Sequence, residues 1–241
     1  MSPSPQPSVT VVIPVHNEAA FLPVALPQLL AEMEAVDAEV TIVIAENGST
    51  DASADLVRES MASHPELQLL QLPDPDYGAA MRDGFLRAET EWVVNFDIDY
   101  FSGEFLNEAL ALADRADIVL ASKRAAGSDD QRTALRRLAT WTFNLILRFV
   151  LRSSVSDTHG MKLVRSTVVA QIAPSVISTV DLFDTELVVR AERAGYRILE
   201  LPASVVEQRD SGSSLLKRVP RTLVGVWRIR RALRSDGSVG R

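Results

Sequence analysis

The stretch Val9-Thr-Val-Val-Ile-Pro-Val-His-Asn-Glu18 decides the fold class of this 241-residue chain. It is a nearly continuous apolar run that ends in polar residues, which is typical of a strand buried on both faces of a parallel sheet. Further runs rich in Val, Ile and Leu lie at 40–45, 67–72, 92–96 and 118–121, with amphipathic segments between them at 19–35, 51–62, 78–89 and 104–113. Strands that alternate with helices in this way predict an α/β fold with a mostly parallel central sheet flanked by helices.

The second half of the chain has a less regular pattern. It predicts a long helix at 132–152, a strand at 161–165, a helix at 181–194, a strand at 197–201 and a further helix after Gly212. No internal repeat or linker separates the halves. We therefore predict one domain over residues 9–215, between a disordered tail at 1–8 and a basic C-terminal helix and tail at 216–241.

Composition excludes several classes of protein. The absence of cysteine excludes disulfides, thiolate metal sites, iron–sulfur clusters and cysteine nucleophiles. A net charge of −7 argues against a general nucleic-acid binder. No window approaches the roughly 20 apolar residues of a membrane span, and residues 1–8 lack the basic start and apolar core of a signal peptide. A cytoplasmic location is expected.

The residues after the first two strands carry information about ligands, because ligands of such sheets bind beyond the carboxyl ends of the strands. The turn after the first strand, residues 14–18, has neither the G-x-G-x-x-G of dinucleotide-binding proteins nor a Walker lysine loop. After the second strand, Gly48 permits a turn with positive φ. Glu46 and Asn47 lie where a carboxylate or amide can read a base edge, although both segments also suit ordinary polar turns.

The fourth strand ends in Asn95-Phe-Asp-Ile-Asp99. Residues i and i+2 of an extended chain point the same way, so Asp97 and Asp99 are predicted to project two carboxylates into one pocket. Two such charges are unfavourable together unless a cation lies between them. Hard oxygen ligands favour Mg²⁺ or Mn²⁺. At the end of a buried strand, this motif indicates a divalent-cation site.

Together these segments resemble the family 2 glycosyltransferases of GT-A fold, particularly the polyprenyl (dolichyl)-phosphate mannosyl- and glucosyltransferases. The resemblance spans roughly residues 9 to 215 and lies in the order and spacing of its pieces. These are VVIPVHNEA (11–19), ENGSTD (46–51), YGAAMRDG (77–84), WVVNFDIDY (92–100), DTHGMKLVR (157–165) and FDTELVVRAERAGYRILELP (183–202).

The resemblance implies a pocket for a nucleotide-diphosphate sugar. Its donor-binding residues would be Pro14, Asn17, Glu18, Glu46, Asn47 and Asp97. The family usually has two aspartates at positions 46 and 47, so the base, uridine or guanosine, stays open. Asp97 and Asp99 would bridge Mg²⁺ or Mn²⁺ to the diphosphate, which places Asp99 among the catalytic residues.

On the acceptor side, Asp184 falls where inverting members of the family often have an acidic catalytic residue. A hydroxyl acceptor must lose a proton, so Asp184 would be its general base. A phosphate acceptor is already ionised, and Asp184 would then hold an arginine or orient the acceptor. Glu186 is either a second acid of the site or an ordinary helix-surface or first-turn acid. The residues expected to bind phosphate or acceptor are Lys123, Arg124, Arg136, His159 and Arg209.

Basic residues gather in the second half of this acidic chain. Residues 132–152 hold five arginines and no acid, and residues 217–234 hold seven basic residues, no acid and Trp227. Basic and aromatic residues at helical spacing suit an interfacial helix attracted to anionic lipid. A core-facing helix with a solvated basic side is an equal alternative. A lipid-phosphate acceptor would explain the pattern.

The sequence therefore favours a metal-dependent inverting glycosyltransferase that moves a hexose from a GDP- or UDP-sugar to a polyprenyl phosphate or similar acceptor, at the cytoplasmic face of a membrane. One alternative is transfer, retaining or inverting, to a soluble small molecule such as a glycerate. The other is a non-catalytic nucleotide-sugar binding module, which the departures from the family at 46, 47 and 101 motivate. No nucleic-acid partner is expected, and the oligomeric state is open.

Overall fold

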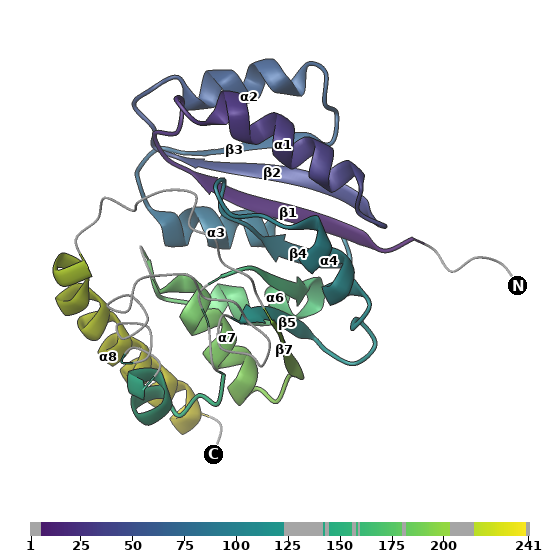
Figure 1. Cartoon of the computed structure of the whole chain (residues 1–241). Coiled ribbons are helices and arrows are strands. Elements are labelled where there is room, and N and C mark those ends of the chain that lie inside the picture. Colours follow the sequence, from purple (N-terminus) through teal and green to yellow (C-terminus); the bar gives the residue numbers. More distant parts are fainter. Residues whose placement is uncertain are drawn as a thin grey trace, which may run out of the picture.

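The computed structural model describes residues 6–122, 142, 145–155, 158, 160–179, 182–202 and 215–239, with the side chains of the last helix described over 222–235. Within them, seven strands form one sheet (Figure 1). The strands are β1 (Ser8–Val15), β2 (Glu39–Asn47), β3 (Leu67–Leu72), β4 (Trp92–Asn95), β5 (Ile118–Ser122), β6 (Lys162–Arg165) and β7 (Ile198–Pro202). Their spatial order is β3-β2-β1-β4-β6-β5-β7. Only β6 runs antiparallel to its neighbours, which confirms the predicted mostly parallel α/β sheet.

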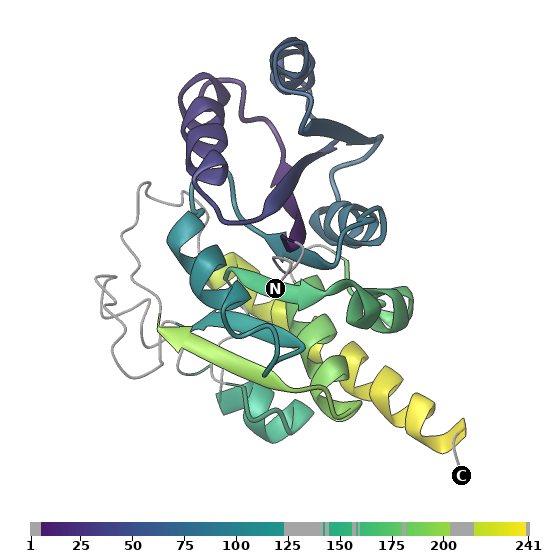
Figure 2. The ribbon, with the colours of Figure 1, turned by 90° about the vertical axis from the view of Figure 1, so that its right-hand side faces the viewer.

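Helices cover both faces of this sheet (Figure 2). The α-helices are α1 (Leu22–Glu34), α2 (Ser53–Met61), α3 (Tyr77–Leu86), α4 (Gly103–Leu110), α6 (Ser166–Ile172), α7 (Phe183–Arg193) and α8 (Leu215–Val239). A π-helical turn η1 (Leu147–Leu151) and a 3-10 turn η2 (Ala173–Ser175) accompany them. Apart from the helix predicted at 132–152, the strands and helices expected from the sequence are present within a few residues, whereas α6 and η2 were not predicted.

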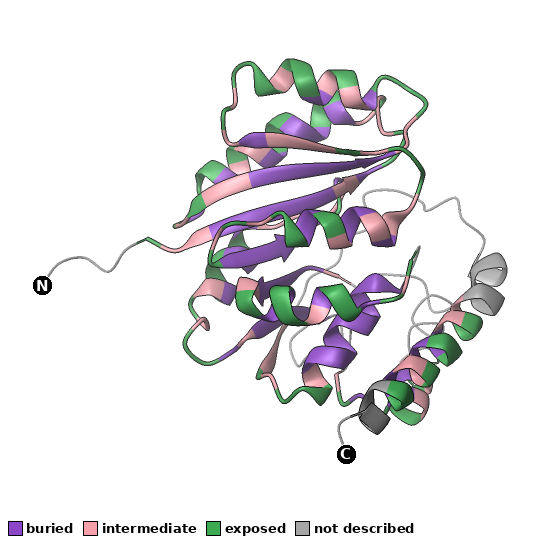
Figure 3. Ribbon diagram, turned by 180° about the vertical axis from the view of Figure 1, so that it is seen from behind, coloured by how far each residue is buried: buried purple, intermediate pink, exposed green. Residues whose placement is uncertain are grey.

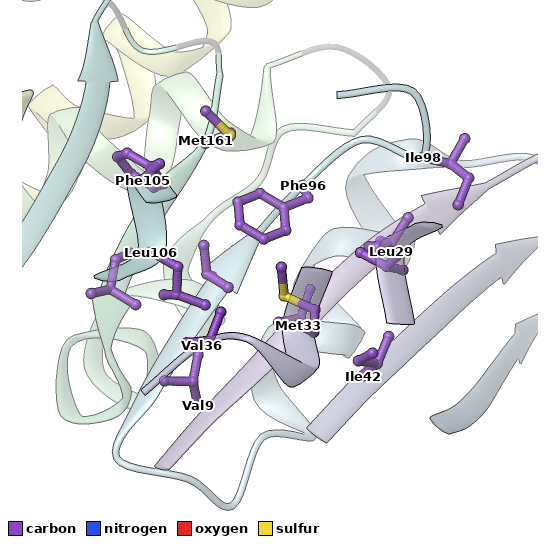
Figure 4. Packing of buried hydrophobic residues seen from close by; sticks show 14 of the residues in the cluster. Val9, Leu29, Met33, Val36, Ile42, Phe96, Ile98, Phe105, Leu106 and Met161 are labelled. Atoms are coloured by element: carbon purple, nitrogen blue, oxygen red, sulfur yellow. The ribbon is translucent and has the colours of Figure 1, made fainter. Parts of the chain in front are cut away.

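Alternation along β1 shows how the strands fill two cores. Val9, Val11 and Ile13 join a cluster with α1 and α4 on one face (Figure 4). Val12 joins a second cluster with α3, α6 and α7 on the other face. Successive side chains of a strand point to opposite faces, so an uninterrupted apolar run is what this position requires. The central strands are accordingly almost wholly buried, while the outer faces of the helices are exposed (Figure 3).

Helix α7 is buried along most of its length: each residue from Phe183 to Ala191 is buried. The second core covers one side of it. A third cluster, formed by η1 and α8, covers Val189 on another side. Polar residues on this helix therefore lie in the interior, where they need partners.

Three predicted segments can be compared with the structure at their ends: the N-terminal tail, the helix at 132–152 and the C-terminal helix. β1 begins at Ser8, and the carbonyl of Pro7 accepts a 2.8 Å hydrogen bond from the Glu39 N–H, inside the stretch predicted as a tail. Residues 145–151 of the helix predicted at 132–152 are helical, and Arg152 ends it with a φ of 58°. Most of the remaining residues of that prediction lie outside the described residues. The predicted C-terminal helix is α8.

We predict that Gly84→Ala destabilises the fold. A Cβ at position 84 would lie 2.5 Å from Cγ1 of Val12, which is fully buried and unable to move away. Overpacking of this kind costs about 1–3 kcal/mol, which for a chain of this size lowers the melting temperature by about 2–12 °C. Asp83→Ala, an exposed neighbour on α3, is the control and should change the stability by less than about 0.5 kcal/mol. Equal melting temperatures for both variants would contradict this account of how α3 packs on β1.

Candidate functional site

The carboxyl ends of β1, β2 and β4 meet at one edge of the sheet. Val15 pairs with Glu46 across β1 and β2, and the Phe96 N–H donates to the carbonyl of Val12, 3.1 Å away. This brings together the three segments that the sequence analysis singled out. Because β6 is antiparallel, its first residue, Lys162, also lies at this edge, opposite Asn95.

Hydrogen bonds join the loop after β1 to the loop after β2. Asn17 adopts a left-handed conformation with φ 56°, and its Oδ1 accepts from the Thr50 N–H at 2.8 Å. The Asn17 N–H donates to Ser49 Oγ at 3.0 Å, and the Glu18 N–H donates to Ser53 Oγ at 2.8 Å. The two loops therefore form one wall. Pro14 and Glu18 lie half-buried in it and Asn17 is exposed.

The loop after β2 has the sharp turn expected at Gly48. Its φ is 65°, and a Cβ there would lie 2.7 Å from the backbone carbon of Asp74. Both the left-handed conformation and the close approach require glycine. The prediction of a positive φ at this position is confirmed.

Glu46 and Asn47, predicted to lie near the base, are both buried and both have protein partners. Glu46 accepts hydrogen bonds from the Ser49 N–H and from Nε2 of Gln71 at 3.1 Å. Burial opposes its ionisation, but these hydrogen bonds outweigh it and hold the pKa of Glu46 below its ordinary value. Asn47 Nδ2 donates to the carbonyl of Val15 at 3.1 Å. Both side chains thus shape the wall, and contact with a base remains a prediction.

The chain that carries Asp97 and Asp99 is not extended, as the prediction assumed. Strand β4 ends at Asn95, and residues 97–100 form a turn in which Asp97 and Tyr100 exchange backbone hydrogen bonds of 3.1 and 2.9 Å. The chain folds back because Ile98 returns to the core cluster that contains Phe96 (Figure 4). Asp97 is left exposed and Asp99 half-buried at the edge of the sheet.

Lys162 holds a buried ionic cluster that the sequence analysis missed. Its side chain is fully buried, and Nζ donates to Asn95 Oδ1 at 2.9 Å, to the Gly160 carbonyl at 2.9 Å and to Asp184 Oδ1 at 2.8 Å. The signal was available, since one of only three lysines stands in an apolar strand. A lysine is almost never fully buried unless it is paired.

The two acids of α7 both lie in the interior. Asp184 pairs with Lys162, and its Oδ2 accepts from the Tyr77 hydroxyl at 2.7 Å. Glu186 lies in the first turn of α7, as one interpretation held, but not at the surface: it is fully buried, pairs with Arg190 at 2.7 Å and accepts from the Ser178 N–H at 2.8 Å. Glu186 is buried because the second and third core clusters pack on different sides of α7.

Several predicted residues cannot be placed from this structure. Lys123, Arg124, Arg136, His159 and Arg209 lie outside the described residues. Strand β5 ends at Ser122, directly before Lys123. Buried Thr158 and half-buried Gly160 flank His159. Their roles toward phosphate or acceptor stay predictions.

A mostly parallel sheet covered by helices on both faces, with polar loops at one edge, makes this an α/β protein of the doubly covered class. The sequence profile described as "Glycosyl transferase family 2" matches residues 10–172, and the chain belongs to this family. It is therefore a glycosyltransferase.

Three similar proteins illustrate this membership. The chain is 32% identical over 154 residues, 62% of its length, to "Undecaprenyl-phosphate 4-deoxy-4-formamido-L-arabinose transferase" of Pectobacterium atrosepticum, of which it spans only 46%. It is 28% identical to "Undecaprenyl-phosphate mannosyltransferase" of Micrococcus luteus, with 95% of this chain and 96% of that protein covered. Glucosyl-3-phosphoglycerate synthase of Mycobacterium tuberculosis, solved with Mn²⁺, UDP and glucosyl-3-phosphoglycerate, shares the fold at a TM-score of 0.69 and 16% identity, covering 93% of this chain and 80% of that one.

We predict that Glu46→Gln destabilises the protein at neutral pH but not in acid. A carboxyl whose pKa is lowered by folding stabilises the fold above its unfolded pKa, and this contribution is lost as the pH falls through its folded pKa. Loss of hydrogen bonds to a charged acceptor costs about 1.5–3 kcal/mol. The difference in melting temperature between wild type and variant should be largest near pH 7 and shrink below the ordinary value of 4.5.

Glu39→Gln is the matched control, because Glu39 is exposed on the same strand. It should show no such pH-dependent difference. A Glu46→Gln deficit that stays constant from pH 7 to pH 3 would contradict the role of the Glu46 charge in holding the loop.

Proposed function

We propose that this glycosyltransferase transfers a hexose from a UDP- or GDP-sugar to a polyprenyl phosphate, with inversion at the anomeric carbon and with Mg²⁺ or Mn²⁺ as cofactor. The turn that carries Asp97 and Asp99, next to the joined loops at the edge of the sheet, is the observation that carries the proposal. The nucleotide sugar would lie along Pro14, Asn17 and Glu18. Lys123 and Arg124 would supply N–H groups that hydrogen-bond its phosphates.

The residues of the turn suit a divalent cation. Asp97 and Asp99 offer hard carboxylate oxygens at the surface, which Mg²⁺ and Mn²⁺ prefer. Among the described residues, no group of three or more His, Asp or Glu gathers. A two-carboxylate site leaves coordination positions for diphosphate oxygens. When bound, the cation would stabilise the negative charge that develops on the departing diphosphate.

The surroundings of Asp184 favour a phosphate acceptor over a hydroxyl acceptor. A general base needs a carboxylate oxygen within reach of the acceptor proton. Both oxygens of Asp184 already have donors, one from Lys162 and one from Tyr77. A phosphate is ionised at pH 7 and needs positioning rather than deprotonation. The names of the two undecaprenyl-phosphate transferases support the same acceptor class.

A soluble acceptor is the second candidate. The shared fold with glucosyl-3-phosphoglycerate synthase is the observation that favours it. That reaction would need no lipid surface. Transfer to a soluble phosphorylated acid in the absence of detergent or lipid would distinguish the two.

Helix α8 and η1 supply a surface for the lipid phase. A buried seam of α8, with Val226 and Ile229, packs on Leu147 and Leu151 of η1. The two elements overlap in the view of Figure 1, in agreement with this packing. What we call the α8 surface is the exposed part of the helix over residues 222–235, namely Leu223, Val224, Trp227, Arg228, Arg231, Arg234 and Ser235.

The α8 surface combines apolar, aromatic and basic side chains. Trp227 is 60% exposed, and Phe149 on the neighbouring η1 is 72% exposed. No acidic residue occurs between positions 222 and 235. This composition suits the headgroup region of an anionic bilayer. No helix within the described ranges has the length and hydrophobicity needed to cross a bilayer.

We predict that Asp97→Asn abolishes metal-dependent donor binding. In wild type, a UDP- or GDP-sugar with Mn²⁺ at 100-fold over its Kd should add about 2.7 kcal/mol of stability, which is roughly 5–10 °C in melting temperature for a chain of this size. Only one of the two bases should give this shift, and a chelator should remove it. The variant should melt like wild type without ligand and show no shift with it.

Asp114→Asn, an exposed acid before β5, is the control and should keep the wild-type shift. An undiminished shift in Asp97→Asn would exclude this residue as a metal ligand. No shift in wild type with any donor and metal would count against the donor site itself.

We predict that wild type binds vesicles containing phosphatidylglycerol and that the triple variant Arg228→Gln, Arg231→Gln, Arg234→Gln binds them far more weakly. Each basic residue near an anionic surface contributes about 1 kcal/mol, so the loss should be about 100-fold in partition coefficient. Cosedimentation with the vesicles measures it.

A control with the same change in net charge replaces the exposed Arg58, Arg87 and Arg115 by Gln. It should bind nearly as wild type does. An equal loss of vesicle binding in both triple variants would show that net charge drives binding without a localised surface. Tight binding of wild type to neutral phosphatidylcholine would argue against an electrostatic attraction to the lipid.

A further inference from the structure

We propose that Lys162 is a positioning residue for sugar transfer, whose ammonium fixes the turn carrying Asp97 and Asp99 against the acceptor-side helix α7. The kinetic part of this inference rests on the proposed function. The structural part, a mechanical link between two halves of the site, does not.

The position of Lys162 in the sheet places it between the two halves. It pairs with Asn95 in the register of β4 and β6. Asn95 is the last residue of β4 and stands two positions before Asp97. The Lys162 ammonium binds the Asn95 side chain and the Asp184 carboxylate at once. A single cation therefore joins the base of the metal-binding turn to the first turn of α7.

The hydrogen-bonding capacity of this ammonium is fully used. Its three N–H donors match three acceptors: Asn95 Oδ1, the Gly160 carbonyl and Asp184 Oδ1. It has no donor left for a substrate and no access to solvent. Lys162 must therefore act through the groups that it holds.

The same cluster fixes the loop before β6. The Gly160 carbonyl accepts from Lys162, and Gly160 has a φ of 134°. Two residues earlier, Thr158 Oγ1 lies 2.9 Å from Thr185 Oγ1 of α7, with both groups buried. The link also reaches α3, since the Tyr77 hydroxyl donates to Asp184.

A contribution to stability alone does not explain why the chain has a charged Lys162–Asp184 pair in its interior. Buried ion pairs can often be replaced by apolar residues of similar volume at little cost, whereas removal of one partner strands a buried charge. The chain offers a comparison on the same helix. Glu186 and Arg190 form an equally buried pair, but Glu186 bonds the backbone of residues 177 and 178 instead of β4. That pair is the matched control.

The test is the double variant Lys162→Met, Asp184→Asn. It removes both charges together, keeps the side-chain volumes similar and leaves an amide oxygen to accept from Tyr77. The double control is Glu186→Gln, Arg190→Met. Each is compared with wild type in thermal melts, in hydrogen–deuterium exchange without ligand, and in steady-state transfer to polyprenyl phosphate.

Hydrogen–deuterium exchange measures directly whether Lys162 holds this turn in place. The N–H groups of Phe96, Asp97 and Tyr100 are hydrogen-bonded in the folded protein, so they exchange only when the turn opens. We expect the Lys162/Asp184 variant to stay folded and to exchange these amides at least about tenfold faster. Turnover should fall about 100-fold, the scale of a displacement of about 1 Å, with the donor KM within about threefold of wild type. The Glu186/Arg190 control should keep wild-type turnover and wild-type exchange at residues 96–100.

Wild-type exchange and turnover in a folded Lys162/Asp184 variant would overturn the proposal. The two charges would then neutralise each other without holding the turn at 97–100 in place. Faster exchange at 96–100 in both double variants would overturn it as well, since any buried pair on α7 would have the same effect. If wild type transfers nothing to lipid phosphate while only the Lys162/Asp184 variant releases residues 96–100, the proposed acceptor fails and the link is supported.

Discussion

An ammonium group inside a β-sheet must be hydrogen-bonded on every side, and this requirement organises the centre of the molecule. Lys162 meets it with one partner from β4, one from the loop before β6 and one from α7. Because β6 runs antiparallel between β4 and β5, its first residue lies at the same edge as the carboxyl ends of β1, β2 and β4. The placement of the buried charge at this edge is a consequence of one change in strand direction.

The two sides of this edge are built differently. On the side proposed to bind the donor, the loops after β1 and β2 hold each other through short polar side chains and backbone groups, as in the contact between Asn17 and Thr50. On the side proposed to bind the acceptor, Asp184 of α7 pairs with the buried Lys162. A rigid donor wall suits a diphosphate that must be held in one orientation. Beyond α7, α8 offers the aromatic and basic surface that a lipid-linked acceptor would require.

The sequence predicted the parts of the structure that depend on local pattern. Apolar runs located the strands, and Gly48 located a left-handed turn. The turn at 97–100 escaped prediction because the return of Ile98 to the core depends on helices distant in sequence. The burial of Glu186 likewise depends on η1 and α8, which cover α7 from outside. The local pattern could have shown that Lys162 is buried, because it stands in an apolar strand, but it could not show the three acceptors, which come from separate parts of the chain.

The most direct measurement is product analysis with wild-type protein, a labelled UDP- or GDP-sugar, Mn²⁺ and undecaprenyl phosphate in detergent. The account predicts that label moves into the organic phase with the anomeric configuration opposite to that of the donor, and that a chelator prevents it. Transfer only to a water-soluble acceptor such as 3-phosphoglycerate, or a lipid product with retained configuration, would contradict it.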